Sequence, residues 1–465
     1  MTTPHINPSN GIGPLVQAWL PTQRWFAGKG RDARIEVAPL AQLSASPPVT
    51  IWTAHVHYAE SDTETYQVPL VLRADPVQVL EHVLLGTIET ESGRRWVYDA
   101  LHDKDVTPAW LAGMRDDVTE GPVRFTRYAA APDDVPVDEP SLVLSGEQSN
   151  TSMVFGDVAI MKVFRRLQPG VNPDIEVLAG LSKLGARHIP RLLGAVDADV
   201  DGAPCSLAML QEFMTTASDG WELAKASVRD LMAEADLHAA EAGGDFAAEA
   251  ERLGAAVAAV HADLASVFGT REASADELGR RAEGMRDRLE RALTVVPALS
   301  DVAQGLAIAF SDVASLADSV TVQRIHGDLH LGQALRTVHR WVLIDFEGEP
   351  MATMDARRAL DSPLRDIAGM LRSFDYAGHH RAIETGYDPQ LSYRAGEWSK
   401  RNRDAFCNGY AEAAGADPRA HEVLLRAFEA DKAVYEAVYE ARNRPAWLPI
   451  PLASLSRLAA DGGTS

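Results

Sequence analysis

The sequence HGDLHLGQ at residues 326–333, followed by LIDFEGEP at 343–350, interrupts an otherwise helical part of the chain. Two short β-branched runs, TVQRI at 321–325 and WVLIDF at 341–346, flank polar residues that do not suit a helix interior. Irregular backbone held between short strands is where a scaffold commonly carries its chemistry. The segment therefore predicts a functional loop within a helical domain.

The spacing of Asp328, Gln333 and Asp345 suits phosphoryl transfer from ATP. This reaction needs a carboxylate that orients or deprotonates the attacking hydroxyl, and ligands that hold Mg²⁺. Asp328 can supply the carboxylate, while Gln333 and Asp345 can bring oxygen ligands from a loop and a following strand. By themselves Asp345, Glu347 and Glu349 indicate either a cation site or a solvated turn. The upstream HGD and glutamine favour the cation site.

Hydrophobic periodicity divides the chain into a β-rich first part and a helical second part that begins near residue 215. The first part is expected to contain one helix from Asp174 to about Leu184, and strands at 49–58, 66–73, 123–129, 141–145, 152–156, 158–164, 191–196 and 206–213. The second part has helical spacing over 222–267, 274–318 and 392–442. We expect three domains, covering residues 1–98, 99–214 and 215–465.

Composition and charge exclude several classes of partner. The chain has 465 residues, with 44 Lys and Arg against 66 Asp and Glu, and a formal net charge of −22. The electric field of this negative net charge repels the phosphate backbone of nucleic acids and anionic lipid surfaces, so we expect neither nucleic acid nor membrane as a partner. The two cysteines show no paired spacing, and no signal peptide or long apolar run is found. A reducing, cytoplasmic location is expected.

Several motifs resemble those of one kinase family. HGDLHLGQ and IDFEGEP are similar to the catalytic loop and the metal-binding motif of kinases in the aminoglycoside phosphotransferase group. More narrowly, they resemble the actinobacterial maltokinases, as do QRWFAGKGR at 23–31, GEQSNTS at 146–152, DSPLRDIAGMLRSFDYA at 361–377 and DKAVYEAVYEARNRP at 431–445. Gln333 stands where most relatives have Asn, and its longer side chain still offers a carbonyl oxygen to a metal.

The resemblance implies a protein-kinase-like two-lobed fold of α+β class, with a β-rich N-lobe, a mainly helical C-lobe and an N-terminal β-rich cap domain. It implies a monomeric enzyme that uses ATP and Mg²⁺ to phosphorylate the anomeric hydroxyl of maltose. Asp328 would be the catalytic base, and Gln333 and Asp345 would be the metal ligands. The product, maltose 1-phosphate, would feed α-glucan synthesis, with a trehalose-synthase-type enzyme as functional partner.

A polar turn at 145–157 can donate backbone and side-chain groups to the phosphates of ATP. The candidates are Ser149, Asn150, Thr151 and Ser152. The turn has no glycine-rich phosphate-loop pattern, and taken alone it indicates an ordinary hairpin.

Lys162 lies in an apolar strand, where burial is costly unless the ammonium is paired. Glu176, on the helix that begins near Asp174, offers the partner. Such a Lys–Glu pair holds phosphates in protein-kinase-like folds. The alternative is that Lys162 sits on the exposed face of an edge strand.

The last predicted strand of the first part ends at Gln211, Glu212 and Phe213, where a hinge could bind adenine through its backbone. This assignment rests on where these three residues lie in the chain, at the end of the predicted strand.

We expect His326 to support the catalytic loop by hydrogen bonding, and His330 to face solvent or substrate. No further His or Cys lies at ligand spacing, so a zinc site is not expected.

Lys432, Tyr435 and Tyr439 fall on one face of a predicted helix. Tyrosines at this spacing usually pack in a core, whereas sugar rings also stack on aromatic side chains. The resemblance to maltokinases, in which this helix lines the sugar pocket, favours acceptor binding. Arg372 and Asp375 could point towards the same cleft.

Three alternatives remain open. A kinase of the same fold could act on glucosamine or an aminoglycoside, and its pocket would then need several carboxylates facing the amines. A protein kinase is disfavoured because the motif is HGD rather than HRD and no APE-like segment follows. A nucleotide-binding protein without catalysis is weakened because Lys162, Asp328, Gln333 and Asp345 are all present.

Overall fold

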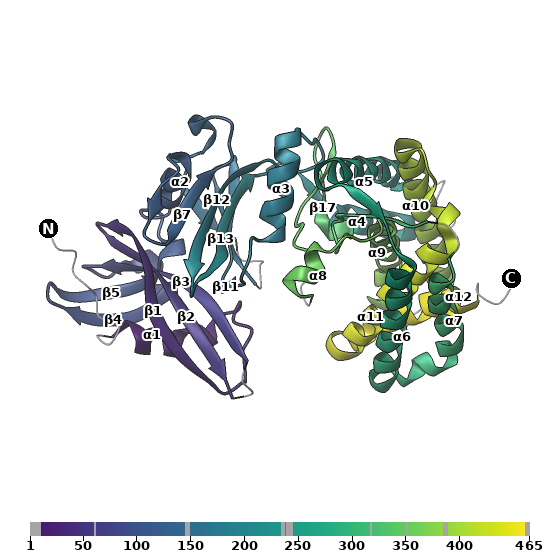
Figure 1. The fold of residues 1–465 in the computed structure, drawn as a ribbon, viewed down its shortest axis with the longest axis horizontal. Helices are drawn as coiled ribbons and strands as arrows, with labels where there is room; N and C mark the ends of the chain where they lie inside the picture. The colour runs from purple at the N-terminus through teal and green to yellow at the C-terminus, as the bar shows by residue number, and fades with distance from the viewer. Residues whose placement is uncertain are drawn as a thin grey trace. The chain divides into compact units, whose positions relative to one another are not determined.

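The computed structural model describes residues 11–59, 62–144, 149–233, 238, 245–316, 319–349, 352–384 and 389–460. The chain divides into two compact units (Figure 1), of which unit 1 is Met1–Ser182 with Pro190–Thr215 and unit 2 is Lys183–Ile189 with Thr216–Ser465. Unit 1 is built mainly of strands and unit 2 mainly of helices, so the predicted α+β class is confirmed. The boundary after Thr215 lies one residue beyond the predicted end of the second domain at 214.

The first sheet of unit 1 is antiparallel, with strand order β1-β2-β3-β5-β4. Its strands are β1 (Ala33–Ala45), β2 (Pro48–Tyr58), β3 (Thr63–Arg73), β4 (Leu84–Thr90) and β5 (Gly93–Asp99), accompanied by α1 (Ile12–Trp19) and the 3₁₀ turns η2 (Leu20–Thr22), η3 (Gln78–Val83) and η4 (Ala100–His102). Ile12, Val16 and Leu20 recur every four residues and are fully buried, so one face of α1 and the turn after it packs into the core of this sheet.

The second sheet of unit 1 has strand order β6-β7-β12-β13-β10-β9-β8. Its strands are β6 (Thr119–Glu120), β7 (Val123–Arg127), β8 (Ser141–Val143), β9 (Thr151–Phe155), β10 (Ala159–Val163), β12 (Leu192–Val200) and β13 (Ala203–Glu212), with helices α2 (Pro108–Arg115) and α3 (Pro173–Leu184) and the turn η5 (Pro132–Asp134). The Asn172 side-chain oxygen accepts a hydrogen bond from Asp174 N at 2.8 Å, which satisfies a free donor at the start of α3.

The two sheets of unit 1 are joined by main-chain pairing. The short strand β11 (Arg166–Leu167) follows β10 and pairs antiparallel with β3 of the first sheet. Next to this pairing, the fully buried Gln67 of β3 donates through Nε2 to the carbonyl oxygens of Phe164 and Leu207, at 2.6 and 2.5 Å. The Gln67 side chain therefore links the first sheet to backbone of the second sheet, at Leu207 of β13 and at Phe164 directly after β10.

Unit 2 is a helical assembly with two small sheets. Its helices are α4 (Gly220–Ala233), α5 (Ala247–Phe268), α6 (Ala275–Val295), α7 (Ala303–Ala314), α8 (Met354–Arg358), α9 (Leu364–Glu384), α10 (Pro389–Ala414), α11 (Glu422–Asn443) and α12 (Pro449–Ala460). The strands are β14 (Ser218–Asp219), β15 (Thr270–Glu272), β16 (Thr321–Gln323), β17 (Ala334–Arg336) and β18 (Trp341–Leu343), and the 3₁₀ turns are η6 (Pro297–Asp301), η7 (Leu331–Gln333), η8 (Pro418–His421) and η9 (Pro445–Trp447). Among the described residues, no helix has the length and apolar character needed to cross a bilayer.

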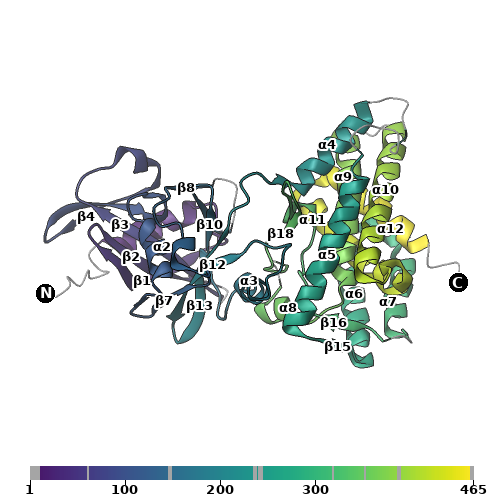
Figure 2. The same ribbon diagram turned by 90° about the horizontal axis from the view of Figure 1, so that it is seen from above.

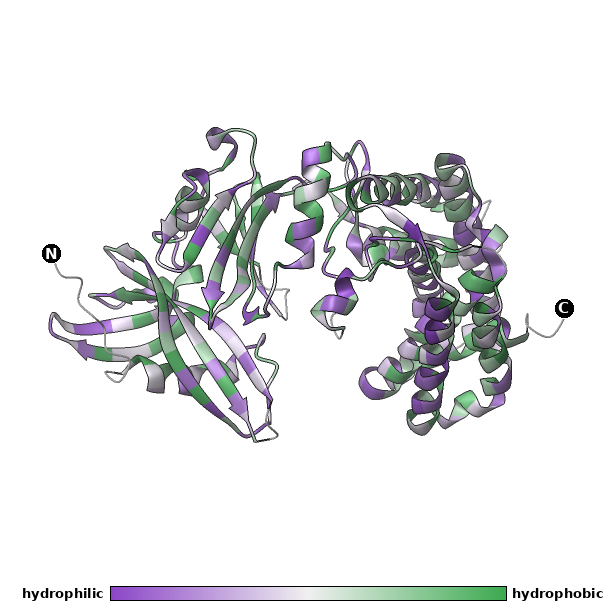
Figure 3. Cartoon of the chain, viewed as in Figure 1, coloured by the Kyte–Doolittle hydropathy of each residue, from purple (hydrophilic) through white to green (hydrophobic). Residues whose placement is uncertain are grey.

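Each of the three predicted helical segments contains more than one helix. The segment at 274–318 is divided into α6 and α7 by the turn that begins at Pro297, because proline cannot continue a helix. Helix α6 is strongly hydrophilic over much of its surface (Figure 3). It nevertheless packs on the core through buried residues at helical spacing, which are Leu278, Ala282, Met285, Leu289 and Ala292.

Helices α5 and α10 lie side by side (Figure 2) and approach closely at two glycines. A Cβ atom built on Gly254 would lie 2.0 Å from the backbone oxygen of Phe406. A Cβ atom on Gly409 would lie 1.9 Å from the backbone oxygen of Glu251. The absence of side chains at these two positions therefore sets the separation of the two helices.

The close approach predicts that Gly409→Ala destabilises the protein, because the added methyl group meets backbone that cannot rotate away. We expect a loss of about 1–3 kcal/mol in the free energy of unfolding, measured by urea denaturation. The matched control is Gly396→Ala on the same helix, where a Cβ atom has no neighbour within 4 Å. This control should be neutral or stabilised by up to about 1 kcal/mol. Equal stability of the two variants would contradict this account of the contact.

Candidate active site

The loop 326–333 is held in place by one buried carboxylate. Asp366, in the first turn of α9, is 1% exposed. Its two oxygens accept hydrogen bonds from His326 N at 2.7 Å and Gly327 N at 2.8 Å. Burial opposes its charge, but the bond with His261 at 3.1 Å and these neighbours together lower the pKa of Asp366. The loop is therefore anchored to α9 by an ionised group.

His326 connects the two quoted motifs. Its Nε2 lies 2.9 Å from the carbonyl oxygen of Ile344, and its ring packs on Phe346 with centroids 4.7 Å apart. Gly327 has a φ of +85°, a conformation that favours glycine, which explains the glycine of the HGD motif. The predicted supporting role of His326 agrees with these contacts.

Gln333 and Asp345 are brought together as the sequence spacing suggests. Gln333 Nε2 donates to Asp345 Oδ2 at 2.9 Å. Asp345 has a φ of +67°, an uncommon backbone conformation for a residue that carries a side chain. A carboxylate beside an amide that also carries an oxygen is a donor set suited to Mg²⁺. These two residues fit the metal that the reaction would need.

Asp328 lies on the same loop and forms an ion pair with Lys432 of α11, with Nζ 3.0 Å from Oδ1. Burial would raise the pKa of Asp328, but the Lys432 ammonium, with His330 and His326, holds it below its ordinary value. Burial likewise opposes the charge of Lys432, whose pKa is raised by Asp328. Both groups are therefore charged near neutral pH.

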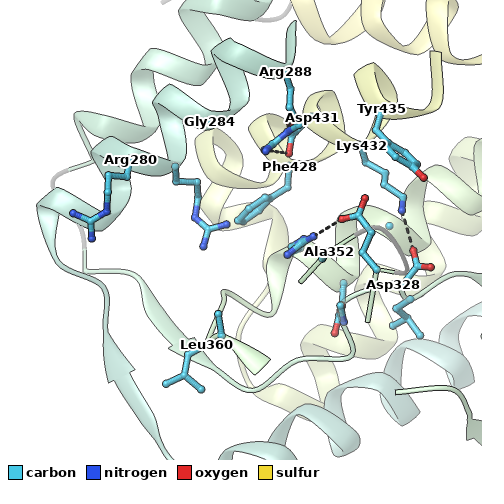
Figure 4. Close-up of a pocket in the computed structure, with 18 of the residues that line it drawn as sticks. Arg280, Gly284, Arg288, Asp328, Ala352, Leu360, Phe428, Asp431, Lys432 and Tyr435 are labelled. Atoms are coloured by element: carbon cyan, nitrogen blue, oxygen red, sulfur yellow. Dashed lines mark hydrogen bonds and ion pairs between the residues drawn. The ribbon is translucent and has the colours of Figure 1, made fainter. Parts of the chain in front are cut away.

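Asp328 lines a pocket of about 590 Å³ within unit 2 (Figure 4). Helix α6 forms one wall, α11 forms another, and the HGD loop with the start of α9 forms the floor. Lys432 and Tyr435, both predicted as acceptor residues, line this pocket, as does Phe428. In Figure 4 the Lys432 ammonium reaches the Asp328 carboxylate.

Every carboxylate that lines the described part of this pocket has a basic partner. Asp431 forms two hydrogen bonds with Arg288, of 2.7 and 2.6 Å. The remaining pairs are Asp328 with Lys432, Glu349 with Arg365, Glu277 with Arg271, and Asp366 with His261. The walls of the pocket are polar, yet they present no unpaired carboxylate to a ligand.

The structure does not bring the other predicted acceptor residues to this pocket. Tyr439 is 44% exposed on α11 and is not among the lining residues. Arg372 is 1% exposed and binds Asp375 at 2.7 Å and Glu436 at 2.7 Å. Arg372 and Asp375 therefore sit in an interior charge network that also includes Ser454 of α12. Such contacts hold α9, α11 and α12 together.

His330 is half-buried and stabilises the loop itself. Its Nδ1 accepts a hydrogen bond from Gly332 N at 3.0 Å, which caps the turn η7. Burial lowers the pKa of His330, so its ring is neutral near pH 7 and can act as this acceptor. His330 is not among the residues that line the pocket.

In unit 1, Lys162 lies on β10 opposite Ser152 of β9 and Met209 of β13. Its Nζ is 4.0 Å from Oδ2 of the buried Asp174 at the start of α3. Glu176 lies in the same turn of α3. The ammonium therefore has a carboxylate neighbour two residues before the predicted one, and the Lys162–Glu176 pair stays a prediction.

The predicted phosphate turn lies partly outside the described residues, because 145–148 are not described. Ser149 and Asn150 precede β9, and Thr151 and Ser152 begin it.

At the predicted hinge, two backbone N–H groups already form hydrogen bonds within the protein. Glu212 N donates to Arg191 O and Phe213 N donates to Val158 O, both at 2.9 Å. Gln211 lies opposite Ile160 on β10. Adenine contacts at this hinge stay a prediction.

Sequence reasoning missed most of the residues that shape the pocket. Asp366 falls within the quoted stretch 361–377, but nothing in the sequence pairs it with a loop forty residues earlier. Arg281 and Arg288 on α6 also line the pocket. In the sequence, these two arginines resemble any other charged residues on the exposed face of an amphipathic helix, and no local pattern marks them as pocket residues.

Comparison with known proteins identifies the family. Residues 19–103 match the maltokinase N-terminal cap domain. A glucosamine kinase from Streptacidiphilus jiangxiensis is 28% identical over 84% of this chain and 92% of its own length. A glucosamine kinase from Mycolicibacterium smegmatis is 30% identical over 69% of this chain and 79% of its own length.

A solved glucosamine kinase, in complex with glucosamine, ADP and inorganic phosphate, has a similar fold. Its TM-score is 0.70 at 23% identity, covering 96% of this chain and 98% of that one. The predicted two-lobed kinase-like fold with an N-terminal cap is confirmed by this likeness and by the cap match. With 30% identity over most of the Mycolicibacterium relative, the chain belongs to the kinase family that includes these glucosamine kinases.

Proposed function

We propose that this chain is an ATP-dependent sugar kinase that transfers the γ-phosphate of ATP to the anomeric hydroxyl of maltose, giving maltose 1-phosphate. The observation that carries the proposal is the position of Asp328, an ionised carboxylate in the wall of a pocket large enough for a sugar. Gln333 and Asp345 lie on the same loop system and contact each other.

Asp328 has the geometry of a base for the acceptor hydroxyl. Among the described residues, Lys432 is the one hydrogen-bond partner of the carboxylate, and it binds Oδ1. Oδ2 is left to accept the proton of the attacking hydroxyl. Lys432 keeps the carboxylate ionised and can also donate to a sugar oxygen. The Tyr435 ring, 5.3 Å from the Lys432 ammonium, offers a face for the sugar.

Each unit carries some of the residues that are proposed to bind the nucleotide or its metal. In unit 1, Lys162 and the turn from Ser149 to Ser152 would bind its phosphates. In unit 2, Gln333 and Asp345 would hold Mg²⁺. When bound, the metal neutralises charge that develops on the phosphates during transfer.

The pocket favours a neutral acceptor over a cationic one. An amine-bearing sugar needs a carboxylate to receive its ammonium group, and each carboxylate lining the described pocket is already paired with a basic group. To bind one of these carboxylates, the ammonium group of an amino sugar would have to displace the basic side chain that is paired with it, which costs free energy. A neutral disaccharide binds without this displacement. The match of residues 19–103 to the maltokinase cap supports the same choice.

Glucosamine is the second candidate, because the relatives from Streptacidiphilus jiangxiensis and Mycolicibacterium smegmatis are both named glucosamine kinases. The remaining expectations accompany the maltose proposal: a monomeric cytoplasmic enzyme, a product that feeds α-glucan synthesis, and a trehalose-synthase-type enzyme as functional partner.

Asp328→Asn should abolish most of the turnover, because an amide cannot accept the hydroxyl proton. We expect kcat to fall by about a hundredfold to ten-thousandfold, while the affinity for an ATP analogue measured by calorimetry stays nearly unchanged. Asp287→Asn, an exposed position on α6 outside the pocket, is the matched control and should keep wild-type activity. Full activity of Asp328→Asn would remove the catalytic base from the proposal.

A substrate panel separates the two acceptors. Initial rates of ADP release should be measured with maltose, glucose and glucosamine. Glucose and glucosamine differ at one position, so their ratio isolates the effect of the ammonium group. We expect kcat/KM for maltose to exceed that for glucosamine by at least about tenfold, and glucose to be used no less well than glucosamine. Turnover of glucosamine without turnover of maltose would overturn the acceptor assignment and leave the kinase assignment standing.

Lys432→Met should move the acid limb of the pH profile. Asp328 must be ionised to act as a base, and Lys432 lowers its pKa; without the ammonium, burial dominates and the pKa rises. We expect the acid limb of kcat/KM to move to higher pH by about 1–3 units. Lys432→Arg keeps the charge and should leave the limb where the wild type has it. A limb that does not move in Lys432→Met would show that Asp328 is not the titrating base.

A further inference from the structure

Unit 1 contains a second cavity, of about 720 Å³, which is separate from the pocket at Asp328 and shares only Asn150 and Thr151 with the residues proposed to bind the nucleotide. It lies where the first sheet and its 3₁₀ turns meet the edge of the second sheet. Its walls come from Gln23–Trp25, from η3 and η4 with the residues after them, from 141–144, and from Asn150, Thr151 and Arg165. Gln23, Arg24 and Trp25 open the motif QRWFAGKGR, to which the proposed chemistry gives no role.

The cavity lies on the opposite face of the second sheet from Lys162. Thr151 pairs with Val163, whereas Ser152 pairs with Lys162. Cross-strand partners point to the same face and successive residues point to opposite faces. Thr151 therefore faces away from the side of β9 that carries Ser152 and Lys162. A ligand in the cavity would be distinct from the nucleotide that Lys162 is proposed to bind.

Arg165 is a charged side chain with an unused donor in the wall of this cavity. The residue is fully buried. Its Nε donates to Thr151 Oγ1 at 2.8 Å and its Nη2 to Asp99 Oδ2 at 2.5 Å, and its guanidinium lies 4.6 Å from the centre of the Trp25 ring. Its Nη1 has no hydrogen-bond partner among the described residues. A buried guanidinium donor without an acceptor is costly, and an anion would satisfy it.

The acidic side chains around the cavity already form ion pairs with arginines of the protein. Asp99 binds Arg165 and accepts from Leu101 N at 3.2 Å. Asp103 and Asp105 both bind Arg73, at 2.6 and 2.8 Å. Lys104, exposed between these two aspartates, has no ion pair within the described chain. The basic groups that remain available favour a negatively charged ligand.

The rim of the cavity is apolar. Val79 is 79% exposed, Leu142 is 58% exposed and Leu144 is 37% exposed. Large side chains exposed together around a cavity mark a surface that prefers a nonpolar partner. A ligand that fits both the rim and Arg165 combines an oxyanion with an organic body.

We propose that this cavity is a binding site for a small organic anion, a phosphate monoester or a carboxylate, whose oxyanion accepts a hydrogen bond from Arg165 Nη1. The organic body of the ligand packs on Leu142 and Val79. Because Arg165 also binds Thr151 at the start of β9, the occupant touches the strand that follows the predicted phosphate turn.

Calorimetric titration of the full chain tests the site. The probes are phenyl phosphate, benzoate and inorganic phosphate, each added with Mg²⁺ and a saturating non-hydrolysable ATP analogue so that the nucleotide site is filled. We expect phenyl phosphate or benzoate to bind, and whichever binds identifies the class of oxyanion. Inorganic phosphate, which lacks an organic body, should bind more weakly.

Two variants and one control locate the binding. Arg165→Met removes the donor, but it also leaves the buried Asp99 without its cation and can destabilise the fold. Val79→Trp narrows the mouth of the cavity at an exposed position and should fold normally. Each should weaken binding by about tenfold or more. Arg166→Met removes the neighbouring arginine, which binds Glu64 outside the cavity, and should bind like the wild type.

Three results would overturn the proposal. The first is that neither organic anion binds to the wild-type chain. The second is binding that survives Val79→Trp unchanged. The third is that inorganic phosphate binds as tightly as the organic anions, which would leave the apolar rim without a role.

Discussion

The hydrogen bonds of Asp366 are the constraint on which the candidate active site depends. A charged carboxylate inside a helical core is costly unless its oxygens are fully used, and here the backbone of the HGD loop uses them. The same bonds fix the direction in which the loop leaves β16. Two residues later the chain presents Asp328 to the pocket, where Lys432 from another helix meets it. The position of the reactive carboxylate thus follows from a buried one that never meets substrate.

Opposite charges in close pairs give the pocket its chemical character. Arg288 with Asp431, and Arg365 with Glu349, build walls that can form hydrogen bonds while carrying little net charge. Such walls suit hydroxyl groups, which both donate and accept. Arg372, Asp375 and Glu436 form opposite-charge pairs in the interior, and with Ser454 they join α9, α11 and α12. Similar residue types therefore serve recognition in one place and packing in another, and burial distinguishes the two.

Much of the fold could be predicted from the sequence because its elements carry strong local signals. The strands β2, β3, β7, β12 and β13 overlap predicted strands, and α3 begins at Pro173, one residue before the predicted start of this helix. Strand β1 contains Pro39 and has few fully buried residues, so its pattern is weak. In the site, Asp328, Gln333 and Asp345 belong to compact motifs whose chemistry is local. The partners Asp366 and Arg288 come from distant helices. Tyr439 was expected at the acceptor site from helical spacing and the family resemblance, and Arg372 and Asp375 were assigned to the same cleft without a spacing argument. Spacing along a helix says which residues share a face, but it does not say which neighbour that face meets.

The pairing of β11 with β3, together with the bridge made by Gln67, has a consequence for how this architecture can change in evolution. The N-terminal sheet is not an appendage that a gene could shed at a linker, because its removal would strip hydrogen-bond partners from Phe164 and Leu207 and expose an open strand edge. A shortened descendant would have to acquire compensating substitutions in the remaining lobe before it could stay folded and unaggregated. Inheritance of the two sheets as one piece is therefore built into the main chain.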